Sequence, residues 1–218
     1  IKYIDAQDNL SIQVHPNDEF ALKYEDECGK NEMWFVVEAK QGAGLYIGFN
    51  KDVSEEEVKK RIDDNTITEV LNFFPTKKGD VFFIPTGTVH AIGEGNLILE
   101  VQQSSNSTYR LYDFDRRDSF GNARELHIEK ALQVIDYKKY EKEVSHDDIE
   151  GCSRLLSQCK YFKVIYYNIV EAEKIQLNKS TFYSLVCISG QGKIQIENQE
   201  MQIKAGDSIF IPAMDEKI

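Results

Sequence analysis

The 218-residue chain lacks the features that mark several classes of protein. Its four cysteines form no C-x-x-C pair, so neither a thiolate zinc site nor a redox dithiol is indicated, and reduced cysteines fit a cytoplasmic protein. It has no apolar run of membrane-spanning length, and no secretory or lipidation motif is recognisable. No basic cluster offsets a formal net charge of −11, which would repel nucleic acid and anionic membranes. We therefore expect a cytoplasmic protein whose partners include neither nucleic acid nor a membrane.

An initiator methionine is also absent. The sequence opens with Ile1-Lys2-Tyr3-Ile4, which already alternates as a β-strand does. This opening predicts that the sequence is a fragment of a longer chain.

The pattern that is present indicates a mainly β protein. With 41% hydrophobic residues the chain can bury a substantial core. Short apolar or alternating segments separated by turn residues predict strands near residues 1–4, 10–15, 30–37, 45–49, 78–92 (two strands around a bend at Pro85), 96–101, 108–113, 162–169, 182–189, 192–197 and 208–212. Helices are predicted at 17–24, 54–62, 68–74 and 128–137, the second from the capping-box signature Ser54-Glu55-Glu56-Glu57.

An internal repeat divides the chain. Residues 78–85 (KGDVFFIP) match residues 204–212 (KAGDSIFIP) around a Gly-Asp turn and an Ile-Pro bend. The charged stretch 138–150 has no apolar periodicity and is the candidate linker. We therefore expect a first domain at 1–137, with a helical insertion around 54–74, and a second at 151–218. No metal site is expected in the second, because Ala213-Met214 follows its proline where the first copy leads to a histidine.

Four side chains of metal-ligand type stand at predicted strand ends in the first domain. Gln13 and His15 share one face of their strand, so both can reach a single ion at about 2 Å. Glu32, which shares a strand face with Lys30, and His90 complete the group. Two imidazoles, a carboxylate and an amide oxygen suit Zn²⁺ first, with Mn²⁺, Fe²⁺ or Co²⁺ compatible. Hydrogen bonds within a β core would satisfy the same histidines, and spacing does not separate the two interpretations.

Four motifs in the chain, in this order, resemble type I mannose-6-phosphate isomerase in its short bacterial form: 10–18 (LSIQVHPND), 30–32 (KNE), 87–91 (GTVHA) and 108–113 (TYRLYD). The resemblance covers nearly the whole chain. It implies a cupin fold with two double-stranded β-helix (jelly-roll) barrels, one catalytic and one degenerate. Since chains of that family begin before Ile1 and continue past Ile218, it also implies that both chain ends are missing and that the second barrel is incomplete.

Site residues follow from the resemblance, motif by motif. It implies one Zn²⁺ per chain, bound by Gln13, His15, Glu32 and His90. It implies a catalytic role for Arg110, an acidic role in the pocket for Glu100, and substrate-binding roles for Lys2, Lys30 and Arg110. It leaves the proton carrier open among Glu100, Lys30 and a zinc-associated water.

The activity that the resemblance implies is interconversion of mannose 6-phosphate and fructose 6-phosphate, an aldose–ketose isomerisation through a cis-enediol in carbohydrate metabolism. The expected partner is a small sugar phosphate, and the expected assembly is a monomer or a homodimer. One alternative is a non-catalytic sugar-phosphate-binding cupin with a structural metal. Another is a metal-dependent oxygenase cupin, which usually has more histidine ligands. Neither alternative gives the cationic residues Lys2, Lys30 and Arg110 as clear a role.

Overall fold

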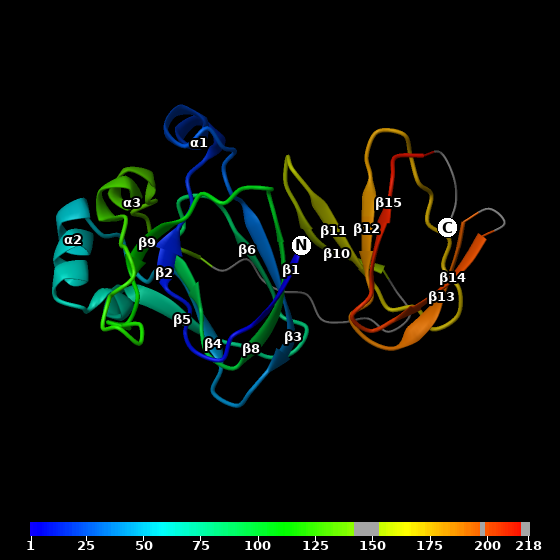
Figure 1. Cartoon of the computed structure of the whole chain (residues 1–218), viewed down its shortest axis with the longest axis horizontal. Helices are drawn as coiled ribbons and strands as arrows, with labels where there is room; N and C mark the ends of the chain where they lie inside the picture. Colours follow the sequence, from blue (N-terminus) through cyan, green and yellow to red (C-terminus); the bar gives the residue numbers. More distant parts are fainter. Residues whose placement is uncertain (142–152, 197–198, 215–218) are drawn as a thin grey trace. The chain divides into compact units, whose positions relative to one another are not determined.

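The computed structural model describes residues 1–141, 153–196 and 199–214 (Figure 1). Contacts divide these residues into two units. The larger unit contains residues 1–141 and 154–166, and the smaller contains Ser153 and residues 167–196 and 199–214. Across the described ranges, no helix has the length and apolar character that a membrane crossing needs.

Two antiparallel sheets form the framework of the larger unit (Figure 1). The four-stranded sheet has the order β1-β8-β3-β6, with bounds Lys2–Asp5, Asn96–Gln102, Glu32–Ala39 and Val81–Ile84. The five-stranded sheet has the order β5-β4-β7-β2-β9, with bounds Leu71–Pro75, Gly44–Phe49, His90–Ile92, Ile12–Val14 and Tyr109–Tyr112. The prediction of a mainly β protein is therefore confirmed.

A hydrophobic core joins the two sheets. Trp34 and Ile98 of the four-stranded sheet pack with Leu45, Ile47 and Ile92 of the five-stranded sheet. The outer face of the four-stranded sheet is covered as well. There Phe35 stacks on Tyr166 and Phe83 contacts Phe162, both from the hairpin of β10 (Ser153–Gln158) and β11 (Lys163–Tyr167). Cover on both faces explains why the strand Met33 to Val37 is a continuous apolar run.

A second hydrophobic core lies between the five-stranded sheet and the helices. The helices are α2 (Glu55–Asp63), the 3₁₀ helix η1 (Ile67–Val70) and α3 (Ile128–Val134). Ile12 and Val14 of β2 belong to this core and are fully buried. Because side chains alternate along a strand, Gln13 and its neighbour His15 face away from this helix-covered core. This alternation places the polar side chains of β2 toward the other sheet.

Two helices begin after capping residues, the second after the Ser54 cap that its sequence signature predicts. Helix α1 (Asp18–Tyr24) begins after Asn17, whose side-chain oxygen accepts a hydrogen bond from Phe20 N at 2.9 Å. Helix α2 begins after Ser54, whose hydroxyl accepts from Glu57 N at 3.2 Å. Side-chain oxygens that accept from the first helical turn stabilise helix starts.

The helix predicted at 68–74 is wrong. Only η1 is helical, and residues 71–75 form strand β5, which pairs antiparallel with β4. Phe74 lies opposite Leu45 and packs on the core between the sheets. Pairing and burial within the sheet thus override the local helical pattern, and the helical insertion ends at Val70 rather than near residue 74.

Most of the predicted linker 138–150 lies outside the described residues. Its first residues are attached to the larger unit: Lys139 N donates to Asp52 Oδ1 at 2.8 Å, and Tyr140 N donates to Phe49 O at 2.9 Å. Two strands, β10 and β14 (Gln199–Lys204), were not predicted.

The smaller unit contains two strand pairs. Strand β12 (Tyr183–Val186) pairs with β15 (Ser208–Ile211), and β13 (Gln191–Ile196) pairs with β14.

The sequence repeat has the same local structure in both copies. Gly79 and Gly206 both have a positive φ, +89° and +91°. The aspartate that follows each glycine accepts a backbone hydrogen bond from three residues upstream, Lys77 N to Asp80 at 3.0 Å and Lys204 N to Asp207 at 2.8 Å. The strands that follow the turns, β6 and β15, each pair antiparallel with an earlier strand, β3 and β12 respectively. Glu32 lies opposite Ile84 in the first copy, whereas Tyr183 lies opposite Ile211 in the second.

We predict that Gly206→Ala lowers the free energy of unfolding of the smaller unit by about 1–2 kcal/mol, because its φ of +91° strains any residue with a Cβ. No atom lies within 4 Å of the added Cβ, so only backbone strain contributes. Gly192→Ala is the control, because it also meets no atom and lies in β13 without a positive φ. Denaturant titration of the two variants measures the difference, and equal stabilities would contradict the explanation.

Candidate functional site

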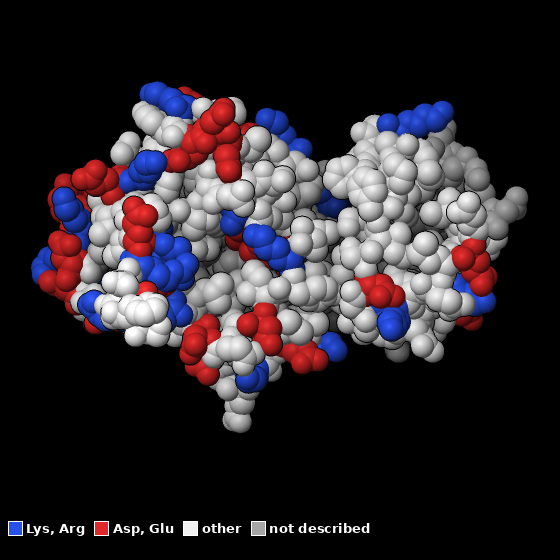
Figure 2. Space-filling view, in the orientation of Figure 1, with Lys and Arg blue, Asp and Glu red and all other residues white. Residues whose placement is uncertain are grey.

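A pocket of about 370 Å³ in the larger unit is lined by both sheets. Figure 2 shows the surface hollowed there, with basic and acidic side chains at its edge. Its polar lining comes from strands far apart in the sequence and from the segment before β9: Lys2, Gln13, Lys30, Glu100, Asn106, Thr108 and Arg110. The structure thus brings five of the predicted site residues, Lys2, Gln13, Lys30, Glu100 and Arg110, around one cavity together with Trp34.

A buried His–Glu–His group lies beside this pocket. His15 follows β2, Glu32 begins β3 and His90 begins β7, and each is at most 1% exposed. Their ligand atoms all lie within 4.8 Å of one another. His15 Nε2 is 3.2 Å from Glu32 Oε1, and His90 Nε2 is 3.7 Å from Glu32 Oε2. Such a group could hold a metal ion. The part of the chain that the structure describes contains one group of this kind.

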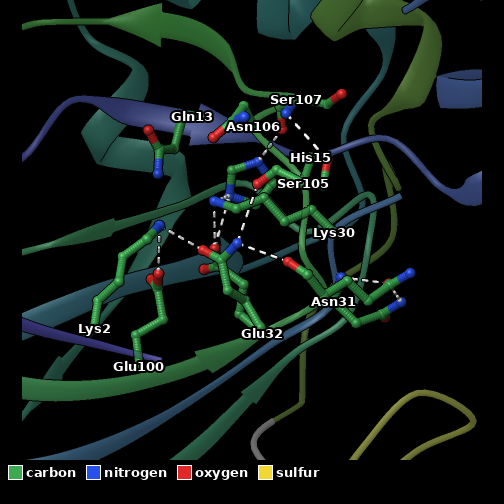
Figure 3. Close-up of polar contacts among 12 residues, drawn as sticks. Lys2, Gln13, His15, Lys30, Asn31, Glu32, Glu100, Ser105, Asn106 and Ser107 are labelled. Carbon is green, nitrogen blue, oxygen red and sulfur yellow. Dashed lines mark hydrogen bonds and ion pairs between the residues drawn. The ribbon is translucent and has the colours of Figure 1, made fainter. Parts of the chain in front are cut away.

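Backbone carbonyls orient both imidazole rings. His15 Nδ1 lies 2.9 Å from Ser107 O, and His90 Nδ1 lies 2.8 Å from Thr88 O (Figure 3 shows the first). A carbonyl only accepts, so each Nδ1 carries the hydrogen and donates it. Each Nε2 consequently faces Glu32. Histidine ligands of metals are held in this way by a second partner on the far ring nitrogen.

The charges around Glu32 keep it ionised. Burial raises its pKa, but nearby His15 and the Lys30 ammonium outweigh that effect and hold the pKa below its ordinary value of 4.5. Burial lowers the pKa of His90 to about 3, so its ring is neutral near pH 7. An ionised carboxylate and a neutral imidazole are the forms in which these side chains bind metals.

The ammonium group of Lys30 contacts this His–Glu–His group. Lys30 Nζ lies 2.6 Å from Glu32 Oε1 and 3.2 Å from His15 Nε2 (Figure 3). Lys30 is only 5% exposed, so its ammonium and the Glu32 carboxylate form a buried ion pair. The predicted placement of Lys30 and Glu32 on one side of the chain agrees with this contact.

Gln13 completes the predicted set of four. Its register partner across β2 and β7 is His90, and its Nε2 lies 3.5 Å from His90 Nε2. The oxygen and nitrogen of an amide are interchangeable by a 180° rotation. Rotation would therefore turn Gln13 Oε1 toward the same point that the two imidazoles face.

Glu100 is the buried acid of the pocket. It lies opposite Lys2 on β1 and opposite Trp34 on β3. Trp34 Nε1 donates to Glu100 Oε2 at 3.2 Å, and Lys2 Nζ lies 3.1 Å from Glu100 Oε1. Lys2 also donates to Gln102 Oε1 at 2.6 Å. Both oxygens of the Glu100 carboxylate are thereby held in place within the pocket lining.

Arg110 reaches the pocket from β9. Its neighbours Tyr109 and Leu111 are buried on the opposite face, as the alternation predicted. Arg110 Nε donates to Ser11 Oγ at 3.2 Å and Nη1 donates to Glu125 O at 2.7 Å. Burial, and secondarily Arg124, lowers the pKa of Arg110 from its ordinary 12.5, but a guanidinium stays charged at neutral pH.

Sequence reasoning missed the contribution of the loop between β8 and β9. This loop supplies the carbonyl of Ser107 and the pocket residues Asn106 and Thr108. The run of small polar residues from Ser104 to Thr108, between two strands predicted to be near the site, was the available signal. The role of Trp34 as a hydrogen-bond donor was also missed, because an isolated tryptophan in an apolar strand predicts only core packing.

Known proteins with similar sequences share one name. A family model described as the mannose-6-phosphate isomerase cupin domain matches residues 153–218. The mannose-6-phosphate isomerase ManA of Bacillus subtilis is 38% identical over 215 residues, which cover 97% of this chain and 68% of the relative. The mannose-6-phosphate isomerase of Streptococcus mutans is 38% identical over 214 residues, which cover 97% of this chain and 67% of the relative.

Solved structures agree with the sequence matches. The crystal structure of the mannose 6-phosphate isomerase from Bacillus subtilis superposes with a TM-score of 0.86 at 32% identity, and the match covers 99% of this chain and 69% of that one. A mutant of phosphomannose isomerase from Salmonella typhimurium has a TM-score of 0.73 at 15% identity over 99% of this chain and 74% of that one. The second match supports the fold alone.

We predict that Glu32→Gln destabilises the metal-free protein by about 3–5 kcal/mol, because the buried Lys30 ammonium would lose its carboxylate. The Lys30→Met/Glu32→Gln double variant should regain much of this stability, since it buries no unpaired charge. Denaturant titration in the presence of a chelator measures all three proteins. A cost below about 1 kcal/mol for Glu32→Gln would contradict the ion pair described above.

Proposed function

Because the chain belongs to the mannose-6-phosphate isomerase family, we propose that its pocket interconverts mannose 6-phosphate and fructose 6-phosphate through a cis-enediol. The observation that carries this proposal is the convergence of a buried His–Glu–His group, a buried acid and three cationic side chains at one cavity. Sugar phosphates are charged and do not cross membranes unaided, so this substrate favours a cytoplasmic site of action.

We propose that Gln13, His15, Glu32 and His90 hold one Zn²⁺ per chain. The donor set fits, because two imidazole Nε2 atoms and an ionised carboxylate face one another and all three side chains are buried. The fixed Nδ1 hydrogen bonds support the same assignment. When bound, the ion would polarise an oxygen of the sugar and stabilise negative charge there.

Isomerisation also needs a group that moves a proton between C1 and C2. Glu100 and Lys30 both line the pocket and are both buried. A cis-enediol exposes both carbons to a base on one face, so one such group can remove the proton and return it. Trp34 and Lys2 hold the Glu100 carboxylate in place, which favours Glu100 for this step.

The cationic side chains of the pocket attract the negatively charged substrate. Lys2, Lys30 and Arg110 line the pocket of a protein with a net charge of −11, and a few cations in a closed site can dominate the local potential. We assign Arg110 to the developing enediolate, because two of its guanidinium nitrogens are fixed by Ser11 and Glu125 and its charge is permanent.

We also propose that the two units are two cupin barrels, the first catalytic and the second degenerate. The shared Gly-Asp turn supports a common origin for the repeat. The family match at 153–218 supports a cupin assignment for the second copy. Tyr183 stands opposite Ile211, where the first copy has Glu32 opposite Ile84, which is consistent with a second barrel that binds no metal.

The non-catalytic alternative is not favoured. Relatives that share 38% identity over nearly the whole chain are named isomerases. A purely structural metal would need neither a buried acid nor a cationic wall beside it. Metal-loaded protein should therefore form fructose 6-phosphate from mannose 6-phosphate in a coupled assay, and binding without turnover would favour the alternative.

Purified protein should contain about one equivalent of zinc, and His15→Ala and His90→Ala should each reduce that content sharply because each removes one donor. His127→Ala is the control, since His127 bonds to the backbone of Arg110 and is not part of the buried group. Metal analysis after dialysis gives the stoichiometry. One equivalent retained in the His15→Ala/His90→Ala double variant would refute the ligand assignment.

Arg110→Ala should lower kcat about 10²–10³-fold, which is the usual effect of removing one preorganised charge-stabilising donor. Its zinc content and melting temperature should stay close to those of the unmodified protein. Arg117→Ala is the matched control, because Arg117 is exposed and pairs with Asp115. A coupled assay for fructose 6-phosphate measures both variants, and near-normal turnover of Arg110→Ala would show that this arginine is structural.

A further inference from the structure

We propose that Glu27 is a positioning residue for the metal group: its carboxylate holds the loop of residues 105–107, so that the Ser107 carbonyl fixes the ring of His15. The inference rests on the metal role proposed above for His15. Glu27 itself does not line the pocket and is not among the proposed ligands.

One oxygen of Glu27 collects donors from three consecutive residues. Glu27 Oε2 accepts from Asn106 N at 2.6 Å, from Ser105 Oγ at 3.0 Å and from Ser107 Oγ at 3.5 Å. The Asn106 N–H, followed by the Ser105 hydroxyl, holds the pKa of Glu27 below its ordinary value of 4.5. The carboxylate is therefore ionised at neutral pH, where its hydrogen bonds are charge-assisted.

The loop needs this support because it belongs to neither flanking strand. Gln102 Nε2 donates to one carbonyl of the loop, Ser105 O, at 3.1 Å, and to Gln103 O just before it at 2.7 Å. The hydrogen-bond donors of the loop, which are the Asn106 N–H and the hydroxyls of Ser105 and Ser107, contact Glu27 instead. Ser105 and Ser107 are buried, so without Glu27 their hydroxyls and the Asn106 N–H would lose a charged acceptor.

The two histidines differ in how their orienting carbonyl is held. His90 donates to Thr88 O, two residues away in its own segment, so the local backbone fixes that contact. His15 donates to Ser107 O, which is 92 residues away in the sequence. The ring of His15 thus depends on the position of a loop, and Glu27 anchors that loop. A displaced carbonyl would free Nδ1 and let the ring rotate or change its tautomer.

Zinc affinity, measured by competition with a chromogenic chelator, tests the inference. Glu27→Ala should weaken binding about 10-fold, within the range seen for partners that orient metal ligands. Glu27→Gln keeps an accepting oxygen and should lose about threefold or less. Glu25→Gln is the matched control, since Glu25 lies two residues away and accepts from Tyr109 and Lys130 rather than from the loop. A loss in Glu25→Gln equal to that in Glu27→Ala would overturn the proposal.

The tautomer of His15 in metal-free protein gives a second, independent result. The chain has four histidines, so ¹H–¹⁵N spectra of the imidazoles can be assigned by single substitutions. His15 should carry its hydrogen on Nδ1 in the unmodified protein and populate the Nε2–H form in Glu27→Ala. If the unmodified protein binds no zinc, the metal role is refuted. The His15 tautomer then still tests whether Glu27 positions the ring of His15.

A folded Glu27→Ala protein with unchanged zinc affinity and an unchanged His15 tautomer would overturn the inference. If Glu27→Ala does not fold, Ser105→Ala replaces it. Ser105 Oγ both donates to Glu27 and accepts from Ser107 N at 3.1 Å, so its loss should loosen the same loop and weaken zinc binding. Unchanged affinity and tautomer in Ser105→Ala would overturn the inference equally.

Discussion

The structure depends on a buried carboxylate that needs a cation. Glu32 is fully buried, and its oxygens face two imidazole nitrogens and the ammonium of Lys30. Burying an ionised carboxylate without a positive partner is strongly unfavourable. The surrounding groups therefore have to supply positive charge or bind it. The Lys30 ammonium meets this requirement in the metal-free protein, and the metal ion that we propose would meet it when bound.

The fold satisfies this requirement through the alternation of β2. Ile12 and Val14 pack under α2 and α3, which holds the strand against the helices. The same alternation turns Gln13 toward His90 and carries His15 to Glu32. The four-stranded sheet brings Glu100 opposite Lys2 and Trp34. Apolar packing on the outside of each sheet thus fixes the polar side chains between them.

Sequence could predict the parts of the site that lie on regular strands. Gln13 and His15 share a face, and Arg110 points away from Tyr109 and Leu111, because a strand alternates with period two. Residues 71–74 were wrongly predicted to be helical, since sheet pairing with β4 outweighed their local helical pattern. The loop at 105–107 was missed for another reason. Its conformation depends on Glu27 and Gln102 side chains, and no periodicity encodes such contacts.

Anomalous diffraction at the zinc edge tests the central claim most directly. Crystals of zinc-loaded protein should show a single strong peak in the larger unit, about 2.0–2.2 Å from His15 Nε2, His90 Nε2, a Glu32 oxygen and Gln13 Oε1. Lys30 Nζ should then have moved away from the Glu32 oxygen that the ion takes. A fully loaded crystal with no peak among these four side chains, or with Lys30 still paired to Glu32 and the ion elsewhere, would contradict the account.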